Sequence, residues 1–484
     1  MAAAGGAGAA APGAAPAAPA YRHIGRGSYG IVIKPALPNI NDHGAEIHHP
    51  NNVTKLFYSE VKKDKALANS QRIVGILGNE SHRAYPYTKS YRHSRLFGLN
   101  VNQQIQANLA TRGVNRRLPL QTLRMRDLGI EIGKISNSVH YNQLRNVSFL
   151  TILQQIRKVF GQINRLVESN YIHGDVRQSN VLINPITGVI SLIDFDWLYP
   201  SEEFFGRYLE SDAFGFYSNP PESLLLSNRY PNPLPSITDP AINPADIIAT
   251  IPANVNEVYN NYVRATVLLW DGVKGTNLAT VIRDIDDALI HNIHYLRSRI
   301  VHGNSEYAVA TGMINETFDR FDNYGLAATI LILLKHVYRM NPPHTAWSQA
   351  VHVNFIRPRI KDNGRDYTVE ELERIVAALY SLEDLLNRVS SFRIDQRPTS
   401  RDVLAELDEI IARFQPAPAP AAVPAAPNVA AAAVPAAPNV AAEIAAGIAA
   451  AVAGPNFGGA RRSRRHRTHG RRSKTQRFRR SRKN

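Results

Sequence analysis

A loop near the middle of the chain combines residue types suited to proton transfer and cation binding. His173, Asp175 and Asn180 follow the order H-x-D-x-x-x-x-N and precede the apolar run Val181–Ile183. In this arrangement Asp175 would accept the proton of an attacking hydroxyl group, and Asn180 would hold Mg²⁺. The alternative is that Asp and Asn only cap turns in a polar loop. The spacing therefore predicts a reactive loop directly before a buried strand.

A further acidic residue follows the next apolar run. Asp194 comes 14 residues after Asn180, at the end of Ile190–Ile193. A carboxylate there is poorly placed for a hydrophobic core and well placed for a hard cation that bridges phosphate oxygens. Asn180 and Asp194 are therefore the expected metal ligands.

A glycine-rich segment near the start of the folded region fits the pattern G-x-G-x-x-G-x-V. The missing side chains would let backbone N–H groups approach phosphates, and Val32 could cover an adenine ring. The segment joins two β-like runs rather than opening a helix, which argues against a dinucleotide-binding βαβ unit. A plain β-turn is the alternative. The residues expected to contact a nucleotide are Ile24, Gly25, Gly27, Ser28, Tyr29, Gly30, Val32 and Lys55.

Lys55 stands 25 residues after Gly30, inside the β-like run Val53–Phe57. A lysine among apolar neighbours could extend from an edge strand into solvent. After a glycine-rich turn, we instead expect a point charge for the α- and β-phosphates of a nucleotide. The expected catalytic set is Asp175, Lys55 and Asn180.

The elements that must position these residues divide into a β-rich part and a helical part. The β-like runs are Tyr21–Ile24, Ile31–Ile33, Val53–Phe57 and Leu118–Met125, with a helix expected over 59–77. From Phe149 onward the apolar residues have helical spacing, and the short β-like runs 181–183 and 190–193 interrupt this pattern. Further helices are expected at about 276–300, 323–339, 369–388 and 399–414. The predicted fold class is α+β.

In order and separation, these motifs resemble a eukaryotic-type protein kinase over about residues 20–414. Pro220-Pro221-Glu222 resembles the motif that closes the activation segment, and Asp322–Ala327 resembles the start of the large buried helix. Arg397 resembles a late arginine that pairs with the glutamate carried here by Glu222. The resemblance implies a two-lobed fold with a β-rich N-lobe and a mostly α C-lobe. It also implies ATP- and Mg-dependent transfer of the γ-phosphate to Ser/Thr hydroxyls of a protein substrate.

More narrowly, the glycine-rich segment, a long insert and a basic tail resemble kinases of giant DNA viruses. That resemblance implies a location inside a host cell, in the nucleus or in the virion. Zero cysteines exclude disulfides, thiolate metal sites and a cysteine nucleophile. We expect neither a secretory signal nor a membrane-spanning segment.

The chain departs from the family pattern at several positions of the site. Gly174 replaces the usual arginine of His-Arg-Asp, Asp196 replaces the glycine after Asp194-Phe195, and Arg177 replaces a lysine. The resemblance implies that control through a phosphorylated activation segment is missing.

The glutamate that should pair with Lys55 is the weakest match. No acid occurs in 68–75, where the family spacing would place it, and the nearby acids are Glu60, Asp64 and Glu80. None of the three is favoured by the sequence. A lost ion pair would fit a kinase of reduced activity.

About 100 residues separate Glu222 from Asp322, and we expect this insert, about 223–321, to form a substrate- or partner-binding subdomain. Its histidines His291, His294 and His302 lack tight metal spacing, so surface or helix-packing roles are favoured over zinc.

Biased composition marks the segments around the predicted kinase-like domain 21–414. Residues 1–20 are Ala/Gly/Pro-rich, and 415–460 form an Ala/Pro-rich linker with an eleven-residue repeat; neither can build a core. The tail 461–484 holds 13 of the Lys and Arg residues and no acid. Subtracting these charges from the net +16 leaves +3 for residues 1–460. The tail is therefore expected to be disordered and to bind nucleic acid non-specifically, with a merely solubilising role as the alternative.

Two other functions remain open. His-Gly-Asp also resembles small-molecule phosphotransferases, although Glu222, Asp322 and Arg397 favour the protein-kinase branch. The alternative without enzymatic activity is a pseudokinase scaffold tethered to nucleic acid.

Overall fold

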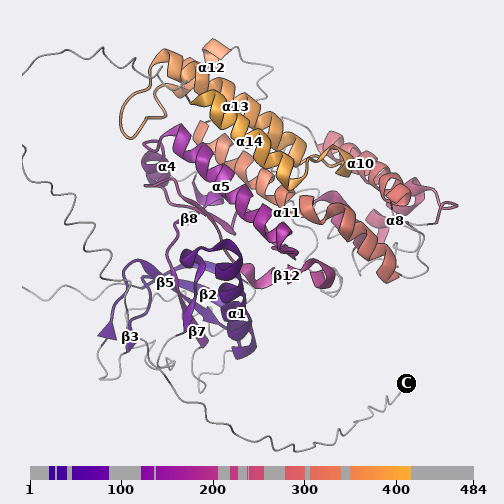
Figure 1. Ribbon diagram of the computed structural model, residues 1–484, viewed down its shortest axis with the longest axis horizontal. Coiled ribbons are helices and arrows are strands. Elements are labelled where there is room, and N and C mark those ends of the chain that lie inside the picture. The colour runs from indigo at the N-terminus through magenta and orange to yellow at the C-terminus, as the bar shows by residue number, and fades with distance from the viewer. Residues whose placement is uncertain are drawn as a thin grey trace, which may run out of the picture. The chain divides into compact units, whose positions relative to one another are not determined.

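The described part of the chain is a mixed α/β fold with a small antiparallel sheet region and many helices (Figure 1). The computed structural model describes residues 21–27, 30–40, 46–86, 121–135, 138–204, 219–226, 237, 239–254, 278–299, 306–338 and 349–415. These residues belong to one unit, Met1–Ala417, and the second unit, Pro418–Asn484, lies outside them. The expected segments 1–20 and 461–484, and the linker 415–460 beyond its first residue, also lie outside the described residues.

The sheet that carries Lys55 has five strands in the order β1-β2-β5-β7-β6, all of its neighbouring pairs antiparallel. Its strands are β1 (Arg22–Gly27), β2 (Gly30–Lys34), β5 (Asn52–Phe57), β6 (Tyr85–Pro86) and β7 (Gln121–Arg126). The expected hairpin is confirmed, because Gly27 pairs with Gly30 across its turn. Lys55 lies between Val32 of β2 and Leu123 of β7, so its strand is central rather than at an edge. Strands β3 (Asn39–Ile40) and β4 (Glu46–Ile47) form a separate pair.

Helix α1 (Glu60–Leu77) confirms the helix expected over 59–77. Ser59 caps its start by accepting a hydrogen bond from the Lys62 N–H, and the left-handed Gly78 ends it. Its buried side chains Ile73 and Leu77 join the main core, so the helix is fixed against the rest of the fold. The short 3₁₀ helix η1 (Glu80–His82) follows.

Short strands and one long helix form the layer between the sheet and the C-terminal helices. Helix α5 (Phe149–Glu168) buries a stripe at helical spacing that includes Ile152, Ile156 and Val159, as expected. Each such side chain stabilises the fold by roughly 1.5–3 kcal/mol. The other elements are α4 (Ser138–Leu144), β8 (Ile130–Glu131), η2 (Ile132–Lys134), β9 (Tyr171–Ile172), β10 (Val181–Ile183), β11 (Ile190–Leu192), η3 (Phe195–Trp197) and β12 (Tyr199–Pro200). Strands β11, β10 and β8 pair in that order, and β12 pairs with β9.

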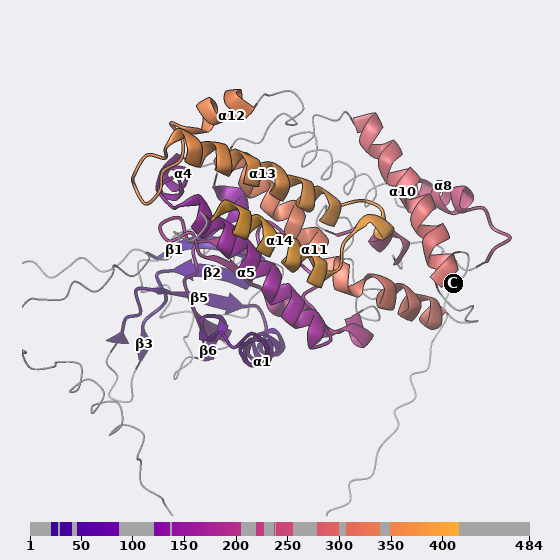
Figure 2. The ribbon, with the colours of Figure 1, turned by 45° about the horizontal axis from the view of Figure 1, so that its top comes forward.

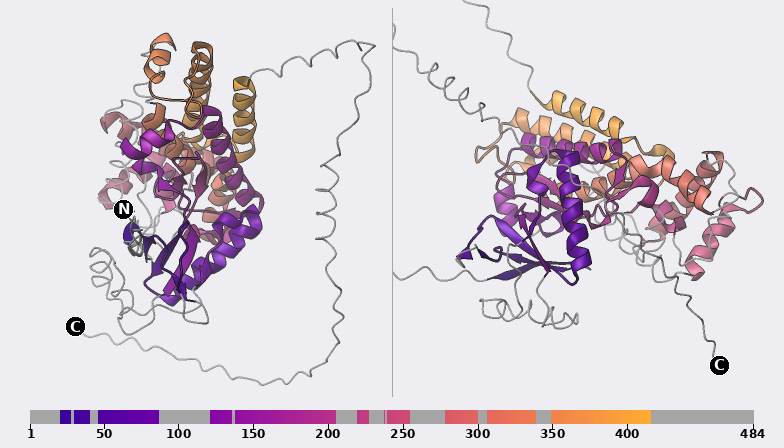
Figure 3. Two further views of the ribbon diagram at one scale, coloured as in Figure 1. Left: turned by 90° about the vertical axis from the view of Figure 1, so that its left-hand side faces the viewer. Right: turned by 60° about the horizontal axis from the view of Figure 1, so that its bottom comes forward.

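The C-terminal helices pack around α5 and α11 (Glu306–Tyr338). Helix α14 lies along α5 and α13, and α11 lies along both α5 and α13 (Figure 2). Figure 3 shows the indigo strands gathered on one side of these orange helices. The remaining elements are η4 (Pro221–Leu226), α8 (Pro244–Asn254), α10 (Leu278–Arg299), α12 (Gln349–Ile356), α13 (Val369–Val389), η6 (Ile394–Gln396) and α14 (Ser400–Phe414).

One helix boundary was predicted wrongly. The sequence reading starts the buried helix at 323, whereas α11 begins at Glu306 and Asp322 lies inside it. No proline interrupts 306–338, so nothing in the chain stops the helix where the expected insert ends. The insert region 223–321 therefore contributes α8, α10 and the first half of α11.

The described residues form two larger hydrophobic clusters. The main one joins α5, α11, α13 and α14 with β10 and β11. The second is built around α10, where Ile285, Leu289 and Ile293 pack with Phe204 and Phe321. None of the helices the structure describes is long and apolar enough to cross a membrane.

Candidate functional site

The loop after β9 is held by a buried carboxylate of α11. The backbone N–H groups of His173 and Gly174 donate to Asp322 Oδ2 and Oδ1, at 2.6 and 2.9 Å. His173 Nε2 lies 3.1 Å from the carbonyl O of Ile193, and the Asp175 N–H donates to His173 Nδ1 at 3.4 Å. A neutral imidazole protonated at Nε2 fits both bonds, and burial lowers the pKa of His173. The loop backbone is therefore fixed up to and including the N–H of Asp175.

Asp175 and Asn180 are brought into direct contact. Asn180 Nδ2 donates to the Asp175 carbonyl O at 2.9 Å and to its Oδ2 at 2.8 Å. Arg177 Nε lies 3.1 Å from Asp175 Oδ1. Burial raises the pKa of Asp175 to about 7, against the opposing pull of Arg177 and Asn180. A carboxyl group with a pKa near neutrality is suited to accept a proton from a hydroxyl group.

The strand pair β10–β11 places Asn180 beside Asp194. Val181 pairs with Leu192, and the Ile193 N–H donates to the Asn180 carbonyl O at 2.9 Å. Asn180 directly precedes β10, and Asp194 follows Ile193 after the end of β11. The two expected metal ligands therefore lie at the same end of this hairpin.

Lys55 completes the cluster from the N-terminal sheet. Its Nζ lies 2.7 Å from Asp194 Oδ1 and 3.2 Å from Asp196 Oδ2. Burial acts against the charge of Lys55, but the two carboxylates outweigh it and raise its pKa. For Asp194 burial is likewise outweighed by Lys55, and its pKa is lowered, whereas burial raises the pKa of Asp196 to about 6. Residues 139 apart in sequence thus form one buried charge cluster.

The backbone at Asp194 adopts an unusual conformation. Its φ and ψ are 62° and 57°, in the left-handed region that few residues other than glycine adopt. Such conformations cost on the order of 1–3 kcal/mol and occur where surrounding structure enforces them. Here the conformation turns the chain from β11 into η3 and points both Asp194 and Asp196 toward Lys55.

None of the three nearby acids pairs with Lys55. Glu60 and Asp64 form exposed ion pairs with Lys63, and Glu80 pairs with Arg83. The buried face of α1 supplies Asn69 instead, which donates to the Phe195 carbonyl O at 2.6 Å.

The glycine-rich hairpin is described in part. Ser28 and Tyr29, at its tip, lie outside the described residues, as do the surroundings of Gly25 and Gly27. Gly25 pairs with Val32 in the hairpin, and Val32 lies opposite Lys55. The Ile24 carbonyl O accepts a hydrogen bond from Lys134 Nζ at 3.3 Å. The expected nucleotide-contacting backbone therefore belongs to the same sheet as Lys55.

The packing of the sheet explains why a glycine occupies position 30. A Cβ at this position would lie 2.0 Å from the Leu56 carbonyl O, which is backbone and cannot move aside. The close approach of β2 to β5 therefore requires glycine here.

Gly174 likewise has a local explanation. Its φ is 73°, and a Cβ there would lie 2.3 Å from Phe204 Cε2. Phe204 is fully buried and forms an edge-to-face pair with Phe321 at 5.4 Å. The buried Phe204 ring therefore leaves no room for a side chain at position 174.

The ion pair implied by the kinase resemblance is confirmed. Arg397 donates to Glu222 Oε1 at 2.5 Å and to Oε2 at 2.8 Å, with both side chains almost fully buried. Arg397 also donates to the carbonyl O atoms of Ser391 and Phe392. This pair ties η4 to the segment between α13 and α14.

The donor set around Asp194 fits Mg²⁺. The described residues contain no group of three His, Cys, Asp or Glu side chains that could hold a metal ion. Asp194 nevertheless supplies a carboxylate. The Asn180 amide turns its nitrogen toward Asp175, and its oxygen accepts a long hydrogen bond from Ser179 Oγ at 3.4 Å, which leaves a second lone pair for a cation. These oxygen donors suit Mg²⁺, which is held through few protein ligands together with waters and substrate phosphates.

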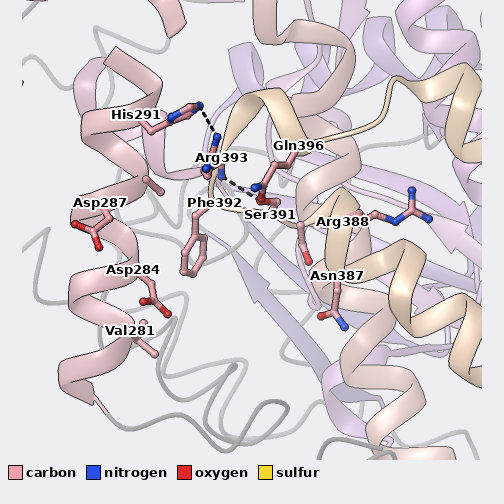
Figure 4. A pocket seen from close by; sticks show the side chains of 12 residues that line it. Val281, Asp284, Asp287, His291, Asn387, Arg388, Ser391, Phe392, Arg393 and Gln396 are labelled. Atoms are coloured by element: carbon pink, nitrogen blue, oxygen red, sulfur yellow. Dashed lines mark hydrogen bonds between the residues drawn. The ribbon is translucent and has the colours of Figure 1, made fainter. Parts of the chain in front are cut away.

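A hollow of about 610 Å³ lies elsewhere, between α10 and the segment after α13 (Figure 4). It is lined by Asp284, Asp287 and His291 on one side and by Phe392 and Arg393 on the other. His291 Nε2 lies 3.0 Å from Arg393 and 3.0 Å from Asp395, so this partly exposed histidine of α10 contacts the segment at η6. His294 is exposed, and His302 lies outside the described residues.

No protein-family model and no curated protein matches the chain. The function is therefore argued from the geometry of the site. Three residues that the sequence reading did not assign belong to it: Asp196, Asn69 and Phe204. A signal existed only for Asp196, which stands two residues after Asp194.

Proposed function

We propose that this protein is an ATP- and Mg-dependent protein kinase that transfers the γ-phosphate of ATP to Ser/Thr hydroxyls of a protein substrate. The observation that carries the proposal is the contact of Lys55 with Asp194 beside the Asp175–Asn180 pair. Four residues from three separate segments, β5, the loop before β10 and the end of β11, form one largely buried cluster of the charges and amide that phosphoryl transfer requires.

Each side chain has a role in this proposal. Lys55 binds the α- and β-phosphates, and Asp194 with Asn180 holds Mg²⁺. Asp175 orients the substrate hydroxyl group and accepts its proton. The bound Mg²⁺ would supply positive charge to the phosphate oxygens. The hairpin β1–β2, in register with the strand of Lys55, covers the nucleotide.

The proposal includes a two-lobed kinase-like fold. The β-rich N-lobe would comprise the five-stranded sheet and α1, and the helices from α5 onward would form the C-lobe. Two arrangements support this view. Asp322 accepts both N–H groups of the His173–Gly174 loop, and Arg397 pairs with Glu222.

A pseudokinase scaffold is the second candidate, favoured by one observation. Helix α1 carries Asn69, an amide, where it packs against η3, and no acid of this helix pairs with Lys55. Such a protein would bind a nucleotide or a partner without transferring phosphate. A small-molecule phosphotransferase, the third reading, lacks a comparable observation.

The deciding experiment measures transfer from radiolabelled ATP to generic acidic and basic proteins with the full chain. Wild type should label at least one substrate in the presence of Mg²⁺, and Asp194→Ala should not. Glu373→Ala, which removes an exposed acid of α13, serves as the matched control and should keep wild-type activity. Wild type that binds no Mg-ATP in a thermal-shift assay and labels nothing would overturn the proposal; binding without labelling would select the scaffold.

The basic tail 461–484 is proposed to tether the protein to nucleic acid. Each phosphate neutralised on duplex DNA should contribute about −0.9 to the slope of log affinity against log salt. Deleting 461–484 should weaken DNA binding at low salt and flatten this slope, while peptide phosphorylation stays near wild type. Unchanged DNA affinity would remove the tethering role.

A further inference from the structure

One ammonium group faces two carboxylates in the cluster around Lys55. The contacts are 2.7 Å to Asp194 and 3.2 Å to Asp196, with the three side chains 13, 26 and 10% exposed. A buried charge is normally matched by one well-placed partner, and a surplus acid in a dry site is costly. The second carboxylate therefore calls for an explanation beyond charge balance.

Helix α1 does not supply an acid to this cluster. Its Asn69 is 4% exposed and bonds the backbone of Phe195, the residue between the two aspartates. Glu60 and Asp64 of the same helix are 70% and 62% exposed and point to Lys63. The helix thus anchors the turn that carries Asp196, and its acids do not pair with Lys55.

We propose that Asp196 is the residue that positions Lys55 for phosphate binding, in place of an acid from helix α1. This inference rests on the proposed function, in which Asp194 holds Mg²⁺. A carboxylate engaged with a cation no longer neutralises a lysine, so Asp196 is the acid left to fix the direction of Lys55. The two carboxylates divide the tasks of metal binding and lysine positioning.

The turn that carries Asp196 is firmly anchored. Asn69 holds the Phe195 carbonyl, and the Phe195 ring packs between His82 and His173, at centroid distances of 5.5 and 4.8 Å. Asp196 therefore projects from a fixed 3₁₀ turn. The position of Lys55 depends on this turn rather than on an acid carried by a helix.

The first test uses unfolding and needs no nucleotide. Asp196→Asn should lower the urea midpoint of the full chain, because Lys55 loses a partner. In a Lys55→Met background the same change should raise the midpoint, because two buried carboxylates then lack a counter-charge. Asp384→Asn, which removes an exposed acid, should do neither. If Asp196→Asn shifted the urea midpoint in the same direction in both backgrounds, the contact between Asp196 and Lys55 would be overturned.

The second test measures steady-state kinetics with ATP and Mg²⁺. Asp196→Asn should lower kcat by about 10- to 100-fold through misplacement of Lys55, with KM for ATP changed by less than about threefold. Asp196→Glu, which keeps the charge, should retain more of kcat than Asp196→Asn. In the Lys55→Met background, Asp196→Asn should leave the residual kcat within about twofold.

The two tests separate the possible failures. Wild type without phosphoryl transfer overturns the proposed function, while the unfolding cycle still decides whether Asp196 and Lys55 are coupled. An active wild type whose kcat is unaffected by Asp196→Asn overturns the positioning role alone. A variant that unfolds is replaced by Asp196→Gly, for which the same losses are expected.

Discussion

Two ion-paired regions of this chain differ in their balance of charge. Arg397 and Glu222 form a two-bonded pair with side chains 0 and 2% exposed, and the guanidinium also donates to two backbone carbonyls. Lys55 instead faces two acids, and one of them, Asp194, is 26% exposed. The first pair is closed and neutral. The second keeps negative charge and an opening, which is what a site for a bound cation requires.

The difference also follows the residue types. The planar fork of arginine matches a carboxylate through two parallel hydrogen bonds and suits permanent pairs. A lysine is a compact charge on a flexible stem that can exchange partners. The comparison therefore separates a closed, neutral pair from a cluster in which one lysine faces two acids.

The largest effect should come from the acid-rich region. We expect Asp175→Asn to lower phosphoryl transfer by roughly 10²–10⁴-fold, because it removes the proposed proton acceptor. Affinity for Mg-ATP should stay close to wild type, since Lys55, Asp194 and the hairpin remain. Turnover and calorimetric binding measure the two quantities. A variant that keeps more than about a tenth of wild-type turnover would remove Asp175 from this role.

Breaking the Arg397–Glu222 pair should lower the free energy of unfolding. Glu222→Gln leaves Arg397 buried without its counter-charge and should cost about 3–5 kcal/mol of unfolding free energy. Asp194→Asn should cost clearly less, because Lys55 keeps Asp196. Urea unfolding of the two variants checks this order. An equal loss in both would erase the distinction between the two regions.

The fold around these regions was largely readable from the sequence. The β-like run Val53–Phe57 located the strand of Lys55, and the helical spacing of Ile152, Ile156 and Val159 located α5. The start of α11 was not readable, because no residue between 306 and 322 forbids or requires a helix.

The sequence predicted most residues of the site but not the contacts between them. Spacing singled out Asp175, Asn180 and Asp194, whose proximity follows from the short hairpin β10–β11. The partner of Lys55 depends on how the sheet packs against a turn 141 residues away, and no local pattern encodes that distance. The contact of Asn69 with Phe195 could not be predicted either, because an amide on a helix can have many roles and its partner lies 126 residues away.

A smaller effect should come from Gly174, in the loop that carries Asp175. Gly174→Ala introduces a Cβ both at positive φ and 2.3 Å from Phe204. The left-handed backbone costs about 1–2 kcal/mol, and overpacking adds about 1–3 kcal/mol. Gly78→Ala is the matched control, because its φ is 61° and nothing lies within 4 Å of its Cβ. The melting temperature should fall further for Gly174→Ala, and equal falls would show that Phe204 yields freely.

The smallest effect should come from an exposed ion pair far from both regions. Hydrogen bonds from Arg365 lower the pKa of Glu371 to about 2, below its ordinary value of about 4.3. Its contribution is therefore present at neutral pH and lost as pH falls from about 4 toward 2. Glu371→Gln should cost less than about 1 kcal/mol at pH 7. The difference from wild type in urea midpoint should narrow toward pH 3, and a constant difference would contradict the assignment.

The close approach of β2 to β5 at Gly30 affects how glycine-rich motifs should be interpreted in related sequences. Because the Leu56 carbonyl alone forbids a side chain there, selection for a stable sheet would retain this glycine whether or not a protein binds a nucleotide. Its presence would then say nothing about activity. Under the proposed function, substitutions at Asp175 or Asp194, where no backbone atom excludes other side chains in this way, would be the informative ones.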